Sequence, residues 1–145
     1  MRLIAIVLIL IAPSWAAAGR YDETVKLSDI SPIFIKILDS SVNGCWTNIM
    51  EAKKYAADQI DMAGGTVGDP FFVYQSSFLI AVNGERMPNG SCYGSWKVKF
   101  NKISYFRDVK VQIVYSEKGR IGVSNTNFNI PILDIIKDHV AEWKN

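Results

Sequence analysis

Residues 92–101 read CYGSWKVKFN, and the alternation within this stretch decides the fold class. Successive side chains of a β-strand point to opposite faces. One face of the stretch therefore carries Cys92, Gly94, Trp96, Val98 and Phe100, and the other carries Tyr93, Ser95, Lys97, Lys99 and Asn101. An apolar face behind a polar one predicts a strand of an antiparallel sheet that buries one side and leaves the other in water.

Further strands are predicted on both sides of this stretch. Residues 71–83 are rich in aromatic and aliphatic residues without helical spacing, which indicates a strand, and residues 84–91 contain a turn motif, MPNG. Residues 109–115 alternate again, with Val109, Val111, Ile113 and Tyr115 inward and Lys110 and Gln112 outward. Residues 117–120, EKGR, are predicted as a hairpin turn, and residues 121–124 as a short fourth strand.

Two amphipathic helices are expected, one before the strands in the chain and one after them. Asn48 and Glu51 form a capping pair, and Gly64-Gly65 ends the first helix. Pro131 stands at the start of the second helix. Their apolar stripes are Ile49, Ala52, Ala56, Ile60 and Ala63 in the first helix, and Ile132, Ile136, Val140 and Trp143 in the second. Residues 31–40 favour a short helix, with a strand as the alternative, and residues 19–27 read as a loosely held polar segment.

The predicted fold is α+β: an antiparallel three- to four-stranded meander sheet with both amphipathic helices packed on the face of Trp96, Val98 and Phe100. The first 18 residues have the parts of an export signal. A positive start, Met1-Arg2, precedes an apolar run that ends at Pro13, and small residues follow at Ala16 to Ala18. An uncleaved anchor is the alternative, but a span needs roughly 20 apolar residues, about twice this run. Residues 19–145 are then expected to form a single domain in the periplasm, or secreted.

Charge and cysteine content narrow the function classes. The chain has 16 Lys+Arg and 14 Asp+Glu, and loss of Arg2 with the signal leaves 15 against 14. This near-neutral balance argues against a nucleic-acid partner. Cys45 and Cys92 are the two cysteines, and in an oxidising compartment they are expected to form a disulfide. Free thiols or a redox pair are the alternatives, although no C-x-x-C spacing occurs.

Few residues point to catalysis. His139 is the only histidine, so no multi-histidine metal site is possible, and no G-x-S-x-G supports a nucleophile. We therefore expect a surface or boundary histidine, and no catalytic residue, metal or cofactor. Asp134, Asp138 and Glu142 recur every four residues and predict a solvated acidic edge; holding a divalent cation or meeting a basic partner is the alternative.

The outward face of the predicted sheet is the candidate binding surface. It should present Tyr93, Lys97, Lys99, Lys110 and Gln112, with Arg107 near its rim. Such a face suits an anionic partner, whereas the competing interpretation is that its lysines only prevent edge-to-edge aggregation.

Three functions follow from these features. We expect a non-enzymatic periplasmic interaction protein: an inhibitor, an immunity-type protein or an envelope-assembly accessory protein. The first alternative is a binding module for an anionic envelope ligand, a lipid phosphate or a cell-wall polymer, on the open sheet face. The second is a carboxylate-dependent hydrolase built from Glu85, Asp69 or Glu117, all in predicted turns. The sequence predicts neither the partner's identity nor an oligomeric state.

Overall fold

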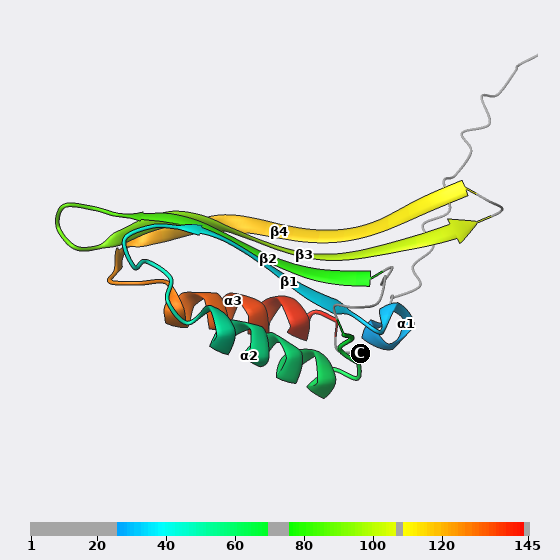
Figure 1. Cartoon of the computed structure of the whole chain (residues 1–145). Helices are drawn as coiled ribbons and strands as arrows, with labels where there is room; N and C mark the ends of the chain where they lie inside the picture. The colour runs from blue at the N-terminus through cyan, green and yellow to red at the C-terminus, as the bar shows by residue number, and fades with distance from the viewer. Residues whose placement is uncertain (1–25, 70–75, 107–108, 144–145) are drawn as a thin grey trace, which may run out of the picture.

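The computed structural model describes residues 26–69, 76–106 and 109–143 (Figure 1). The predicted signal peptide, residues 1–18, lies outside these ranges, as does Arg107. In chain order the elements are α1 (Leu27–Ile30), β1 (Phe34–Ser41), α2 (Ile49–Met62), β2 (Ser76–Arg86), β3 (Cys92–Phe106), β4 (Val109–Asn125) and α3 (Asn129–Ala141). No helix among the described residues is long and apolar enough to cross a bilayer.

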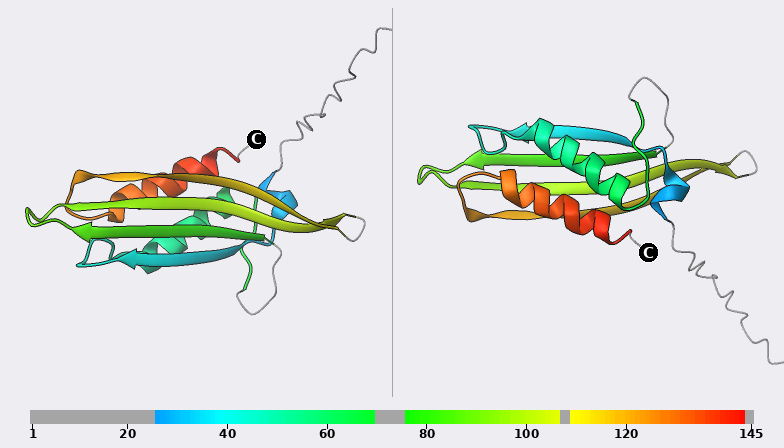
Figure 2. Two further views of the ribbon diagram at one scale, coloured as in Figure 1. Left: turned by 90° about the horizontal axis from the view of Figure 1, so that it is seen from above. Right: turned by 90° about the horizontal axis from the view of Figure 1, so that it is seen from below.

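The four strands form one sheet in the order β1-β2-β3-β4. β2, β3 and β4 pair antiparallel, whereas β1 pairs parallel to β2. Helices α2 and α3 lie side by side on one face of the sheet, and no helix of the described residues covers the other face (Figures 1 and 2). The α+β class and the shared helix face are therefore confirmed, but the all-antiparallel meander is wrong at β1.

Most of residues 31–40 belong to strand β1, so the short helix predicted for this segment is wrong. Ile35 pairs with Phe78 and Ile37 with Ile80, at the two-residue period of a strand. Because α2 lies between β1 and β2 in the chain, it returns the chain for a parallel pairing. The predicted loose segment is also wrong at its last residue, since Leu27 is fully buried in α1; residues 19–25 lie outside the described residues.

Residues 117–120 lie inside β4, so the predicted hairpin turn and separate fourth strand are wrong. β4 is continuous from Val109 to Asn125. Two of the residues that resemble turn residues have a specific neighbour here. Gly119 lies against the Trp96 indole, where an added Cβ would come within 2.8 Å of the ring, and Glu117 contacts His139. Tertiary contacts thus override the local turn composition.

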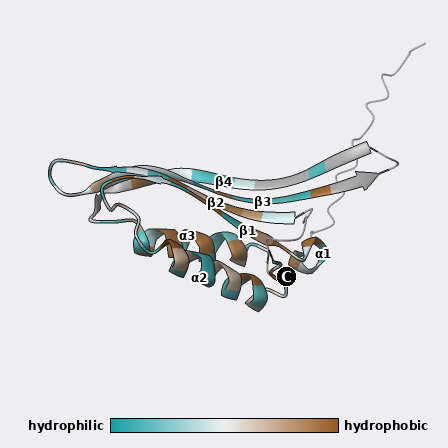
Figure 3. Ribbon diagram, in the orientation of Figure 1, coloured by the Kyte–Doolittle hydropathy of each residue, from teal (hydrophilic) through white to brown (hydrophobic). Residues whose placement is uncertain are grey.

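The core lies between the helices and the sheet. Both predicted helical stripes are confirmed: Ala52, Ala56 and Ile60 of α2 are buried, as are Ile132, Ile136 and Val140 of α3. Polar and apolar residues alternate along both helices in Figure 3. The predicted strand at 71–83 corresponds to β2, with residues 71–75 outside the described ranges, and β2 continues to Arg86 through part of the predicted turn.

Two glycines let a helix end approach the sheet. Gly84 and Gly94 face each other on β2 and β3, and the ring of Phe128, which precedes α3, covers both. A Cβ on Gly84 would lie 2.1 Å from the Phe128 ring. The absence of both side chains therefore positions the start of α3.

The predicted disulfide between Cys45 and Cys92 is present, with Cα atoms 5.7 Å apart. It joins the loop before α2 to the start of β3. Arg86 reinforces the same junction, since its guanidinium donates hydrogen bonds to the carbonyl oxygens of Asn43, Gly44 and Gly90. The disulfide and these hydrogen bonds thus connect this end of the sheet to the loop before α2.

Candidate functional site

The candidate site is the face of the sheet that α2 and α3 leave uncovered, called the open face below. The strand register places Lys97 of β3 directly opposite Lys118 of β4. Two residues along, Ser95 faces Arg120 on one side of this pair, and Lys99 faces Ser116 on the other. Lys97, Lys118 and Arg120 are exposed, and Lys99 is half-buried. The open face therefore carries four cationic side chains on two adjacent rigid strands.

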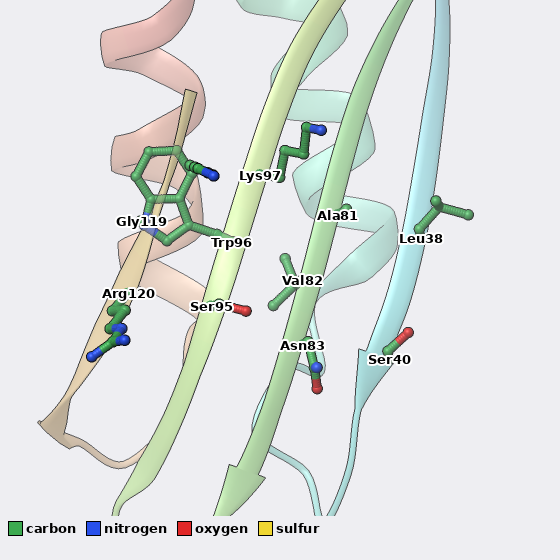
Figure 4. A pocket seen from close by; sticks show the side chains of 11 residues that line it. Leu38, Ser40, Ala81, Val82, Asn83, Ser95, Trp96, Lys97, Gly119 and Arg120 are labelled. Atoms are coloured by element: carbon green, nitrogen blue, oxygen red, sulfur yellow. The ribbon is translucent and has the colours of Figure 1, made fainter. Parts of the chain in front are cut away.

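A hollow of about 610 Å³ crosses this part of the open face (Figure 4). Its apolar part comes from Leu38 of β1 and Ala81 of β2, while Lys97, Lys118 and Arg120 lie on its β3 and β4 side. The full lining is Leu38, Ser40, Ala81, Val82, Asn83, Ser95, Trp96, Lys97, Lys118, Gly119 and Arg120. The volume falls in the range of small-molecule sites, roughly 300–1,000 Å³.

A second hollow of about 430 Å³ adjoins the first. Both are lined by Asn83, Ser95 and Arg120, so they form one continuous depression. The second hollow also contains Tyr93 and Glu85, which face each other across β2 and β3. The depression therefore runs from a cationic end to an end with one carboxylate.

The cations of the open face are not neutralised within the described residues. No carboxylate there forms an ion pair with Lys97, Lys99, Lys118 or Arg120. Like charges directly opposite on neighbouring strands are destabilising, by up to about 1 kcal/mol. An anion bound between Lys97 and Lys118 would relieve that repulsion, so the arrangement suits recognition of negative charge.

The predicted binding residues fall partly on this face. Tyr93, Lys97 and Lys99 lie on it, and the register continues the same face to Gln112, whose amide donates a hydrogen bond to Asn101. Lys110 lies opposite Tyr105 in the register, although its side chain is outside the described ones, and Arg107 lies outside the described residues.

Lys118 and Arg120 were missed because their segment was interpreted as a turn. The signal that would have found them is the alternation itself. Positions 110, 112, 116, 118 and 120 share one parity, so an uninterrupted strand carries the outward pattern of Lys110 and Gln112 onward to Lys118 and Arg120.

His139 is fully buried, so its predicted place at the surface or boundary is wrong. It lies three residues after Ile136 and therefore joins the buried stripe of α3. Its Nδ1 lies 2.8 Å from a carboxylate oxygen of Glu117. Burial lowers the pKa of His139 and outweighs the opposite effect of Glu117 and Glu142, which leaves the ring neutral at pH 7.

The acidic groups considered for catalysis or cation binding do not gather at one place. Asp134 and Asp138 are exposed on α3 and Glu142 is exposed directly after it, all on the helix side of the sheet. Glu85 lies in β2 and Glu117 in β4, not in the predicted turns. Glu85 borders the open face, whereas Glu117 contacts His139 on the helix side, so these two carboxylates do not converge.

No protein-family model matches the chain, and no curated protein matches it. Among solved structures, it is similar to a PelC dodecamer from Paraburkholderia phytofirmans. One crystal form, of a single-substitution variant, is 11% identical with a TM-score of 0.49, covering 83% of this chain and 90% of that one. A second form is 10% identical with a TM-score of 0.47, covering 83% and 91%.

Proposed function

We propose that this chain is an exported, non-enzymatic binding protein that uses the open face to hold an anionic group of a partner in the cell envelope. The observation that carries the proposal is the facing pair Lys97 and Lys118, with Lys99 and Arg120 beside it, over a hollow of about 610 Å³. Maintaining two unneutralised like charges face to face costs stability. An anion bound between the two lysines would offset that cost.

The chemistry of the depression supports binding over hydrolysis. The larger hollow is lined by hydroxyl, amide, ammonium and guanidinium groups, with no carboxylate or imidazole among its described lining residues. Ammonium and guanidinium groups attract phosphate and carboxylate oxygens, and Asn83 and Ser95 can add neutral hydrogen bonds. The disulfide at the end of the sheet is compatible with an oxidising compartment, which is where export would deliver the chain.

The test is a matched pair of charge-reversal variants of the mature chain. Lys97→Glu/Lys118→Glu alters the open face, and Lys53→Glu/Lys54→Glu makes the same change in net charge on the exposed side of α2. Binding is measured by sedimentation with vesicles containing phosphatidylglycerol, and by calorimetry with an acidic polysaccharide and with polyglutamate. These three probes represent lipid phosphate, an acidic wall polymer and an acidic protein surface.

We expect the wild type and the α2 variant to bind the same one of these probes, and the open-face variant to lose at least about tenfold in affinity, or about 1.4 kcal/mol. Binding should also weaken as salt rises, since exposed charges are screened. Equal losses in both variants would show a non-specific effect of net charge. Absence of binding to all three probes would refute the proposal.

A further inference from the structure

A second group of polar side chains lies on the helix side of the sheet, apart from the open face. His139 of α3 is fully buried, and its ring is nearly parallel to those of Phe78 and Phe100, with interplanar angles of 11° and 9°. These two phenyl rings restrict the orientation of the imidazole. Its Nδ1 is directed at Glu117 of β4, 2.8 Å away.

Glu142 completes the group from the end of α3. It follows His139 by three residues, so both side chains lie on one side of the helix. Potential ligand atoms of Glu117, His139 and Glu142 all lie within 4.8 Å of one another. Glu117 is partly exposed and Glu142 is exposed, so solvent reaches the cluster from the outside while the histidine is fixed from the inside.

One imidazole nitrogen and two carboxylate oxygens form a mixed donor set. Such a set suits a divalent transition metal better than Mg²⁺ or Ca²⁺, which prefer all-oxygen sites. Around tetrahedral Zn²⁺, with ligand bonds of about 2.1 Å, ligand atoms lie roughly 3.4 Å apart. The ligand atoms lie within 4.8 Å of one another, and His139 Nδ1 lies 2.8 Å from Glu117. A shift of about 1–2 Å in the exposed Glu142 side chain and a slight widening of the contact between His139 and Glu117 would give that spacing.

We propose that Glu117, His139 and Glu142 bind one divalent transition-metal ion, with Zn²⁺ the best match, and leave its remaining position to water. The ion would replace the direct contact between His139 and Glu117 and link α3 to β4. From the sequence we expect no metal, with a divalent cation on Asp134, Asp138 and Glu142 as the alternative. The sequence does not show that Glu117 of β4 lies beside His139 and Glu142. The proposal is independent of ligand binding on the open face.

The test uses the mature chain after treatment with a chelator and dialysis. Calorimetry with Zn²⁺ should give one equivalent bound, and Co²⁺ should give a visible absorption band of a nitrogen- and oxygen-ligated ion. Bound Zn²⁺ should raise the melting temperature, because the ligand binds only the folded chain. Mg²⁺ and Ca²⁺ should produce neither heat nor stabilisation at the same concentrations.

Two exposed residues of α3 provide the variants. Glu142→Gln should weaken Zn²⁺ and Co²⁺ binding at least tenfold, whereas Asp138→Asn, next to His139 but outside the cluster, should bind as the wild type does. Both substitutions are at exposed positions, and circular dichroism checks that both variants fold. Absence of stoichiometric Zn²⁺ binding by the wild type, or equal binding by Glu142→Gln, would overturn the proposal.

Discussion

The disulfide between Cys45 and Cys92 should account for much of the stability of the mature fold. The two cysteines are 47 residues apart, and closing a loop of that size lowers the entropy of the unfolded chain by an amount worth about 4 kcal/mol at 25 °C. For a mature chain of this size, each kilocalorie shifts the melting temperature by roughly 3–5 °C. Breaking the bridge should therefore lower the melting temperature by about 12–20 °C.

The assay compares the wild type with Cys45→Ser and with Cys45→Ala/Cys92→Ala, by urea denaturation with and without reductant. Without reductant, both variants should be less stable than the wild type by about 4 kcal/mol. With reductant, the wild type should fall to within about 1 kcal/mol of the variants, because only the crosslink distinguishes them. A gap of the same size in both conditions would show instead that the loss comes from the packing of the buried thiols.

Three further predictions concern single positions. Lys97→Glu should replace repulsion of Lys118 by attraction, so we expect weaker anion binding together with a gain of about 0.2–1 kcal/mol in unfolding free energy; a loss of stability would contradict this. Gly94→Ala should lower the free energy of unfolding by at least about 2 kcal/mol, because the new Cβ would lie 2.1 Å from a β2 carbonyl oxygen. An unchanged free energy of unfolding, measured by urea denaturation, would show that β2 and β3 can separate there. Because burial holds the pKa of His139 below 6.5, the unfolded chain binds the proton more tightly. In chelator, stability should be complete above pH 6.5 and fall as the pH drops through the lowered pKa, more steeply in Glu117→Gln; urea midpoints between pH 8 and 5 that do not fall would contradict this.

The sequence predicted the elements in which buried apolar residues recur at a regular period. The stripes of α2 and α3 and the alternation around Trp96 each depend on one local period, so the α+β class and the shared helix face could be inferred. β1 could not, because a short apolar run such as Ile33 to Leu38 fits a strand or a helix equally well. Its parallel pairing depends on β2, more than 30 residues further along the chain.

The site was predictable to a similar extent. Lys97 and Lys99 were placed by the alternation of their own strand, whereas Lys118 and Arg120 were hidden in a segment with the composition of a turn. Gly119 reads as a turn residue because its reason, the Trp96 indole lying against it, comes from another strand. The burial of His139 likewise depends on rings from β2 and β3 that the sequence of α3 does not show.

The most direct test of the open face is a map of amide chemical-shift changes during titration of isotope-labelled mature chain with whichever anionic probe binds. We expect the largest changes to fall on β3 and β4 around Lys97, Lys118 and Arg120, and to disappear in Lys97→Glu/Lys118→Glu. Two results would contradict this expectation. The largest changes could fall on α2 or α3, or Lys97→Glu/Lys118→Glu could show the same changes as the wild type.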